Sequence, residues 1–239
     1  MALTVDENGY LFSGITSLGV KVLRGTEFIR NFKDYSEAVP GKDGEILFGV
    51  DMEAGLISLP CFVETTPDTW DAKEAEIMGY LNPKLGVQTL TFANRPGKVY
   101  NVLYIGQLKF AEEGPGYRMF TIPFKMHDPL IKASTQSTLT GSGTAVNGGN
   151  DETPCIVEIV GLVTNPSVTI GGKTMTYTGT VTASDMLIID TEKLTCTFNG
   201  ANALGNLTGL TPSIKLAVGN NVVTVTGGTV TLKWNNKFI

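Results

Sequence analysis

The sequence predicts a mainly β protein of two domains with a single short helix. Apolar and polar residues alternate with a period of two in several segments of the first half, as in strands that are buried on one face. One stretch after residue 66 has helical spacing and helix-capping residues. The second half consists of short β-branched segments separated by Gly and Asn, a pattern typical of a β-sandwich or jelly roll.

Charge density divides the chain near residue 133. Residues 1–133 contain 30 Lys, Arg, Asp and Glu, whereas residues 134–239 contain 11 of these and 21 threonines. Threonine is β-branched and half polar, so it suits the solvent face of a strand. Residues 134–144 are small and polar, like a linker or an exposed strand. We therefore expect a first domain over 1–133, a linker over 134–144 and a second domain over 145–239.

Two segments of the first domain predict half-buried strands. The alternating apolar residues are Leu59, Cys61 and Val63 in one, and Phe120, Ile122, Phe124 and Met126 in the other. The sequence Glu113-Gly114-Pro115-Gly116 precedes the second strand and is typical of a turn. It predicts a hairpin between the strands near residues 108–110 and 119–124.

A double turn precedes another alternating segment. Pro40 sets φ near −65° for one turn position, and Gly41 accepts the positive φ of a type II turn. Asp43-Gly44 is a second turn dipeptide, which leads into a strand with apolar residues at every second position. These alternating residues are Ile46, Phe48 and Val50.

The helix is predicted to begin at Thr66-Pro67 and to end at Asn82-Pro83. Thr66 is a suitable N-cap, Pro67 suits the first helical position, and two aspartates, Asp68 and Asp71, lie at the positive end of the helix dipole. Its apolar stripe consists of Trp70, Ile77, Met78 and Leu81. A helix of about four turns is not stable alone, so we expect it to pack on a sheet.

The second domain is predicted to consist of strands only. The expected segments are 156–160, 167–170, 173–177, 186–190, 193–198, 214–216, 222–225 and 229–234. Gly171-Gly172 and Gly227-Gly228 have the length and composition of two-residue hairpin turns. Short strands with Gly and Asn between them again favour a sandwich or jelly roll.

Several short sequences, taken in order, resemble the distal tail proteins of long-tailed, siphovirus-type phages. In the first domain these are Phe12–Val20, which includes Gly14 and Gly19, the turn Pro40-Gly41-Lys42-Asp43-Gly44, Leu90–Phe92 with Tyr100–Val102, and the strand end Asp128-Pro129. In the second they are Asn147–Gly149, Thr153-Pro154, Gly219–Val222 and Trp234. Each piece is common alone, and their order and spacing over 239 residues carry the resemblance.

The resemblance implies a structural, non-enzymatic protein of the virion tail, made in the cytoplasm of the host bacterium. It implies a β-sandwich-like first domain with one helix and a β-hairpin, which lines the channel of a hexameric ring, and a galectin-like second β-sandwich that projects outward. Partners would be further copies of the chain, the tail tube protein, a tail-tip or tail-associated lysin protein, and a receptor-binding or adhesin protein. It does not assign the ring contacts to particular residues.

Composition excludes several classes of partner. The net charge is −5 with the two signs interspersed, so the chain lacks the basic footprint of a protein that binds duplex DNA or an anionic membrane. No segment approaches the ~18 apolar residues of a transmembrane helix. Residues 1–7 do not have the pattern of a secretory signal, so we expect the three cysteines, Cys61, Cys155 and Cys196, to be buried free thiols.

The residues predict no catalytic, metal or cofactor site. His127 is the single histidine and has no Gly-x-Ser-x-Gly or Cys–His context. One His and three scattered Cys do not have zinc-ligand spacing, and no Gly-rich stretch has a phosphate-binding frame. The acidic pairs Glu112-Glu113 and Asp151-Glu152 would point to opposite faces of a strand. Asp185 and Asp190 lack the loop pattern of an EF-hand.

A carbohydrate-binding module of a surface or secreted protein is the alternative function. The lectin sites of galectin-like folds use a His, Asn and Arg set with a stacking Trp. Residues 134–239 contain no His and no Arg, and their only Trp is Trp234 in an alternating segment. The resemblance therefore extends to the scaffold of such a domain and not to a lectin site.

Overall fold

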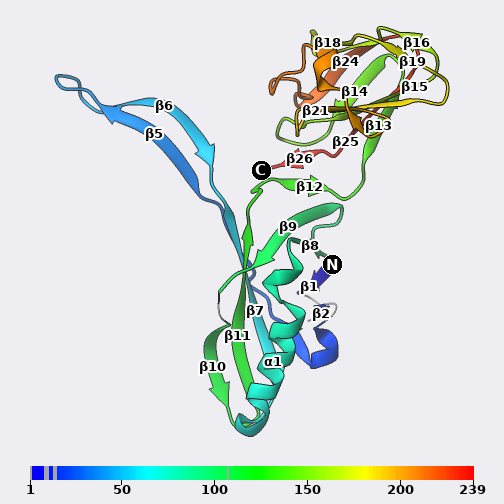
Figure 1. The fold of residues 1–239 in the computed structure, drawn as a ribbon. Coiled ribbons are helices and arrows are strands. Elements are labelled where there is room, and N and C mark those ends of the chain that lie inside the picture. Colours follow the sequence, from blue (N-terminus) through cyan, green and yellow to red (C-terminus); the bar gives the residue numbers. More distant parts are fainter. Residues whose placement is uncertain (1, 8–10, 13–14, 107) are drawn as a thin grey trace. The chain divides into compact units, whose positions relative to one another are not determined.

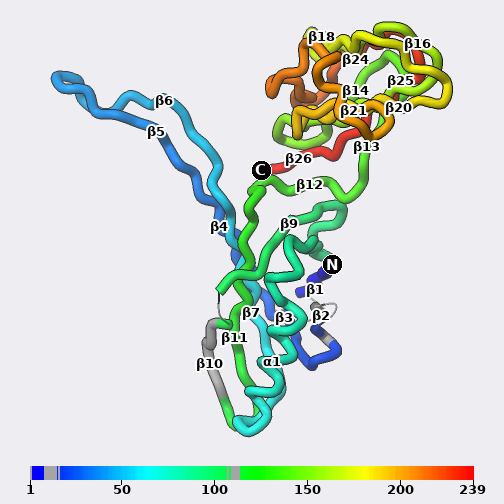
Figure 2. Tube along the Cα trace, viewed as in Figure 1, coloured from blue at the N-terminus to red at the C-terminus, as the bar shows by residue number. Residues whose placement is uncertain are grey.

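A computed structural model of the chain describes residues 2–7, 11–12, 15–106 and 108–239 (Figures 1 and 2). The chain forms two compact units, Met1–Ile131 and Lys132–Ile239. Both consist mainly of strands, and the described residues contain one α-helix, which confirms the predicted fold class. None of the helices in these residues is long and apolar enough to cross a membrane.

The first unit has a sandwich-like arrangement of strands in the order β2-β1-β8-β9-β11-β7-β3. Their bounds are β1 (Ala2–Asp6), β2 (Leu11–Phe12), β3 (Val20–Val22), β7 (Gly55–Glu64), β8 (Gln88–Phe92), β9 (Lys98–Tyr104) and β11 (Tyr117–Met126). β10 (Lys109–Gly114) pairs with β11 and β4 (Glu27–Ile29) with β7. β1 runs parallel to β8, and the other pairs in this order are antiparallel.

The centre of this unit is the antiparallel pair β7–β11, which is in register over ten residues of each strand. Side chains at every second position of both strands are buried, among them Leu59, Ile122 and Phe124. The β10–β11 hairpin turns at Gly114–Tyr117, as the turn sequence predicts. The period of two therefore identified both central strands correctly.

The predicted helix is present and begins with a tighter turn. The 3-10 helix η2 (Pro67–Thr69) leads into α1 (Trp70–Tyr80), and η1 (Thr16–Leu18) lies near the start of the chain. Thr66 donates its backbone N–H to the hydroxyl of Thr69 at 3.1 Å, which closes a capping box. Trp70 and Ile77 are buried, and the Trp70 ring packs against Phe120 with 5.9 Å between ring centroids.

The second unit is a sandwich of two antiparallel sheets. One has the order β13-β25-β15-β20-β21-β22 and the other β14-β24-β17-β18-β23. The first comprises β13 (Ser137–Thr140), β15 (Ile156–Val160), β20 (Met186–Asp190), β21 (Thr195–Phe198), β22 (Ala201–Asn202) and β25 (Thr229–Trp234). The second comprises β14 (Gly143–Asn147), β17 (Ser167–Ile170), β18 (Lys173–Tyr177), β23 (Leu207–Thr208) and β24 (Gly219–Thr226).

Short elements complete this unit. These are β12 (Ile131–Ala133), β16 (Val163–Thr164), β19 (Thr180–Val181), the 3-10 helix η4 (Leu204–Asn206) and β26 (Lys237–Phe238). Buried residues from both sheets, such as Val157, Ile189 and Val223, form one core. Residues 214–216, predicted as a strand, instead contribute an isolated bridge between Leu216 and Thr153.

Two details differ from the sequence prediction. Residues 134–144, expected as a linker, include β13, paired with β25, and the start of β14, paired with β24. Gly171-Gly172 forms the predicted turn between β17 and β18. Gly227-Gly228 does not form a hairpin, because β24 and β25 belong to different sheets. A β-carbon on Gly227 would lie 2.5 Å from Cγ2 of Val163, so both glycines serve a close crossing between the layers.

Candidate functional site

The most unusual feature of the first unit is the hairpin of β5 (Phe32–Ala38) and β6 (Glu45–Met52). Among the described residues, the two strands pair only with each other and form a separate two-stranded sheet. Figure 1 shows this hairpin, in blue and cyan, running away from the other strands of its unit. Two strands alone are marginally stable in water, so a projecting hairpin is expected to need a covering partner.

Large apolar side chains of the hairpin are exposed. Phe48 is 69% exposed, Leu47 60%, Phe32 58% and Val50 54%. The strand predicted from the alternation of Ile46, Phe48 and Val50 is present as β6, and Phe48 and Val50 are exposed on it. Soluble proteins expose single apolar residues freely, but a group of this size marks an interaction surface.

Strand register places most of these side chains on one face. The pairs Phe32–Met52, Asp34–Val50 and Ser36–Leu47 lie on the same face, because side chains alternate along each strand and the register shifts by one residue after Tyr35. The extra residue of this bulge is Phe48. Phe32, Leu47, Val50 and Met52 thus form what we call the apolar face of the hairpin.

Acidic groups lie on the apolar face as well. The Ser36 hydroxyl donates to Oδ2 of Asp34 at 3.1 Å and to Oε2 of Glu45 at 2.5 Å. On the other face, the Lys33 ammonium lies 5.1 Å from the centroid of the Tyr35 ring. The apolar face is therefore flanked by negative charge near its middle and tip.

The tip of the hairpin contains the double turn predicted from Pro40-Gly41-Lys42-Asp43-Gly44. Gly41 has φ of 84° and Gly44 has φ of 82°, the positive values expected of glycine in such turns. The N–H of Lys42 donates to the carbonyl of Val39 at 3.1 Å, which closes the first turn. Pro40 and Asp43 take part through backbone geometry, and both are exposed.

The other residues that carry the resemblance occupy turns. Gly14 lies outside the described residues, whereas Gly19 follows η1 with φ of 79°. Oδ1 of Asp128 accepts the N–H of Leu130 at 3.2 Å just after β11, and Pro129 lines a small cavity with Phe28 and Tyr100. Positions Gly19, Asp128 and Pro129 therefore shape the backbone of the first unit.

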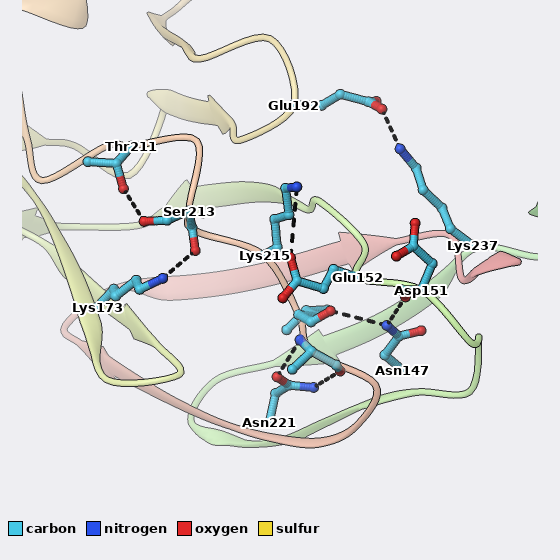
Figure 3. A network of polar contacts seen from close by, with 12 residues as sticks. Asn147, Asp151, Glu152, Lys173, Glu192, Thr211, Ser213, Lys215, Asn221 and Lys237 are labelled. Carbon is cyan, nitrogen blue, oxygen red and sulfur yellow. Dashed lines mark hydrogen bonds and ion pairs between the residues drawn. The ribbon is translucent and has the colours of Figure 1, made fainter. Parts of the chain in front are cut away.

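In the second unit, two buried asparagines close loop ends (Figure 3). The Asn147 amide donates to the carbonyls of Asp151 at 2.8 Å and Leu216 at 3.1 Å. The Asn221 amide accepts the N–H of Ala217 at 2.9 Å and donates to the carbonyl of the same residue at 2.8 Å. Asn147 is followed by Gly148 and Asn221 lies two residues after Gly219, but nothing in the sequence predicts their burial or their partners.

A cavity of about 160 Å³ lies in the second unit, lined among others by Thr153, Cys155 and Trp234. Three of the lysines at its wall are paired with acids: Lys233 with Glu158 at 2.7 Å, Lys237 with Glu192 at 2.8 Å and Lys193 with Asp190 at 3.5 Å. The Trp234 side chain is 5% exposed, and its ring N–H donates to Oδ1 of Asn236 at 3.2 Å. This tryptophan therefore does not present a face on which a sugar could stack.

The structure does not bring the titratable candidates together. His127 is exposed just after β11, and the side chains of Glu112 and Glu113 lie outside the described residues. Glu152 is 3.8 Å from Lys215, with both side chains largely exposed (Figure 3). Among the residues that the structure describes, no group of three or more His, Cys, Asp or Glu could hold a metal ion.

The two aspartates considered for calcium instead hold turns. Asp185 accepts the N–H and hydroxyl of Thr182 at 2.9 and 2.6 Å, and the amide of Asn199 at 2.7 Å. These hydrogen bonds, that of the Thr182 hydroxyl foremost, lower the pKa of Asp185. Oδ1 of Asp190 accepts the N–H groups of Glu192 and Lys193.

The three cysteines are free and buried, as the sequence predicts. Burial raises the pKa of the Cys155 thiol to about 11, and it also raises the pKa of Cys61 and of Cys196. A buried thiol with a raised pKa is a poor nucleophile. The cysteines are therefore part of the two cores.

Two protein-family models match this chain. Residues 13–126 match a phage tail protein RIFT-related domain, and residues 148–238 match the C-terminal domain of a siphovirus-type tail component. The chain belongs to the distal tail protein family of siphovirus-type phages. It is a structural component of the virion tail.

One of the solved structures that resemble this chain shows the same fold. The Dit protein of phage SPP1, described as a paradigm of the hub adsorption apparatus in phages that infect Gram-positive bacteria, aligns over 91% of this chain and 94% of its own. The TM-score is 0.79 at 16% identity. Two structures of the phage P2 baseplate align over 93% of each chain, with TM-scores of 0.41 and 0.37 at 7% and 8% identity, too low to carry an argument. The comparison with curated proteins found no match.

Proposed function

We propose that this distal tail protein forms a hexameric ring at the distal end of the tail tube, and that the hairpin β5–β6 is the arm through which each copy holds its neighbour. The observation that carries this proposal is the uncovered apolar face of the hairpin, with Phe32, Leu47 and Val50 each more than half exposed. A contact between two different patches of one chain is heterologous, and it closes into a ring when the rotation between copies allows it.

The two units have different roles in this proposal. The first unit carries the arm and lines the channel, where the acidic net charge of −5 disfavours tight binding of the passing DNA. The second unit receives tail-tip, tail-associated lysin or receptor-binding proteins, and the ring also contacts the tail tube protein. All of these proposed functions are structural.

The proposal is tested by replacing two side chains of the apolar face, Leu47→Ser with Val50→Ser, in the full chain. Because both are exposed, we expect an unchanged unfolding midpoint and a loss of rings from electron micrographs of phage tails. A matched control, Val146→Ser with Val222→Ser, changes two exposed valines of the second unit and should leave the rings intact. Rings of another symmetry, or rings that survive loss of the apolar face, would contradict the proposal.

A further inference from the structure

The proposed ring requires a second surface on each copy, and we infer that this surface is the segment Lys84–Val87, which follows α1 (Figure 1). This inference rests on the proposed function and names the patch that receives the arm. The apolar face of one hairpin would pack on Leu85 and Val87 of the next copy, with Lys84 facing the acids of the hairpin.

Exposure singles out this segment. In the described part of the first unit, nine large apolar side chains are exposed, and seven of them belong to the hairpin, its tip or its base at Ile29. The other two are Leu85, 59% exposed, and Val87, 60% exposed. Two such residues, two positions apart, form the apolar counterpart that a heterologous contact needs.

Hydrogen bonds hold the segment in one conformation. It begins with the 3-10 helix η3 (Pro83–Leu85), and Oδ1 of Asn82 accepts the N–H of Lys84 at 3.0 Å. Gly86, with φ of 78°, donates its N–H to the carbonyl of Pro83 at 3.0 Å. The next residue after Val87 is the buried first residue of β8, Gln88. Leu85 and Val87 are thus presented by a fixed turn, which lowers the entropy cost of binding.

The charges of the two surfaces are opposite. Residues 32–52 contain five acidic and two basic residues, and Asp34 and Glu45 lie on the apolar face. Residues 82–98 contain no Asp or Glu, and Lys84 is exposed beside Leu85. Opposite charges around an apolar contact favour the heterologous pairing over the pairing of two hairpins with each other.

The arm is long enough for this contact. Strands of seven and eight residues reach about 25 Å at 3.3 Å per residue. A compact unit of 131 residues has a radius of gyration of about 14 Å. The hairpin is thus longer than the radius of gyration of a first unit, so it is long enough to reach across much of the first unit of a neighbouring copy.

Disulfide trapping tests the pairing in the full chain. The natural cysteines are buried, so cysteines introduced at exposed positions will be the reactive ones. A chain with Leu47→Cys is mixed at millimolar concentration with a chain of different mass that carries Val87→Cys, under mild oxidation. A parallel mixture with Val222→Cys, an exposed position of the second unit, is the control.

We expect the disulfide between the cysteines introduced at positions 47 and 87 to form about tenfold more than the disulfide between positions 47 and 222. The bound geometry raises the effective concentration of the first two thiols. Equal yields of these two disulfides, or a dominant disulfide between two chains that both carry Leu47→Cys, would overturn the assignment of Lys84–Val87. If six-fold rings on tails depend on the hairpin but the selective disulfide does not form, this inference fails and the proposed function stands. If tails show no such rings, the proposed function fails first.

Charge reversal gives a second measurement. Glu45→Lys in the chain with Leu47→Cys, or Lys84→Glu in the chain with Val87→Cys, should lower the yield of the selective disulfide about fivefold, and the two changes together, one in each chain, should restore it. Equal losses in the single and double variants would show that these two groups do not face each other, and would overturn the charge pairing.

Discussion

Single residues fix the ends of strands in this protein, through backbone conformation and buried amide groups. Gly41 and Gly44 supply positive φ at the tip of the arm, whereas the side-chain amides of Asn147 and Asn221 donate hydrogen bonds to backbone carbonyls. At other positions glycine is needed because a second backbone segment lies too close for a β-carbon. Gly149 is one of these, since it lies against the backbone of Lys237, nearly ninety positions away.

We predict that Gly149→Ala lowers the free energy of unfolding of the second unit by ~2 kcal/mol or more. A β-carbon at this position would collide with the backbone carbonyl of Lys237. Gly148→Ala is the matched control, because its β-carbon meets only the amide end of Asn236, at 3.3 Å. Urea unfolding followed by the fluorescence of Trp234 measures both variants, and similar midpoints would contradict the prediction.

We predict that Asp185→Ala removes part of the pH dependence of stability. The pKa of Asp185 is lowered in the folded state, mainly by the Thr182 hydroxyl. The contribution of Asp185 to the free energy of unfolding is therefore full above the pKa that it has in the unfolded chain. This contribution is lost as the pH falls through the lower pKa of the folded state, below about 4. The stability difference between the native chain and the variant should shrink on acidification. Ser184→Ala, at a neighbouring position in the same turn, should give a difference that is constant with pH.

Secondary-structure elements show why the same pattern has two outcomes. β7 and β6 both present apolar residues on one face, but β7 is covered by its own unit and β6 is not. A hairpin that pairs only with itself contributes little to the core. Changes in it should therefore act locally and on assembly rather than on the whole unit.

We predict that Gly41→Val and Gly44→Val each loosen the hairpin by ~1 kcal/mol, because both positions have positive φ. Hydrogen exchange of residues 32–52 should become faster, while the melting temperature of the first unit changes little. Gly49→Val, in the same hairpin without positive φ and with open space around the new β-carbon, is the control. A large drop in melting temperature would show that the hairpin is part of the core.

At the scale of the whole chain, two compact units imply that each can be produced alone. We predict that residues 132–239 fold cooperatively as a soluble monomer, since a domain of this size buries its own core. Residues 145–239 lack β13 and the first two residues of β14, so they lose pairing at an edge of each sheet. Chemical denaturation should show a clearly lower midpoint for the shorter fragment, and equal midpoints would contradict the prediction.

Local chemistry alone was enough to predict the class of fold, the two-part organisation and most elements. The alternation of Phe120, Ile122 and Phe124 predicts a strand regardless of where that strand lies in the fold. Thr66-Pro67 likewise predicts the start of a helix regardless of the surface on which the helix packs. Positive φ at Gly41 and Gly44 follows from turn geometry within four residues. Such features depend on atoms close in sequence, so they can be read from the chain.

The tertiary structure decided which strands pair and which apolar faces are covered. Residues 134–144 are polar enough for a linker, and only the pairing of 137–140 with β25 and of 143–144 with β24 makes those residues parts of strands. Gly227-Gly228 has the composition of a hairpin turn but crosses between sheets, because Val163 lies against it. Leu47 and Val50 lie on one face of a strand, as core residues do, and remain exposed. A period of two shows that a strand has an apolar face, but what covers that face depends on residues distant in the chain, or on another copy.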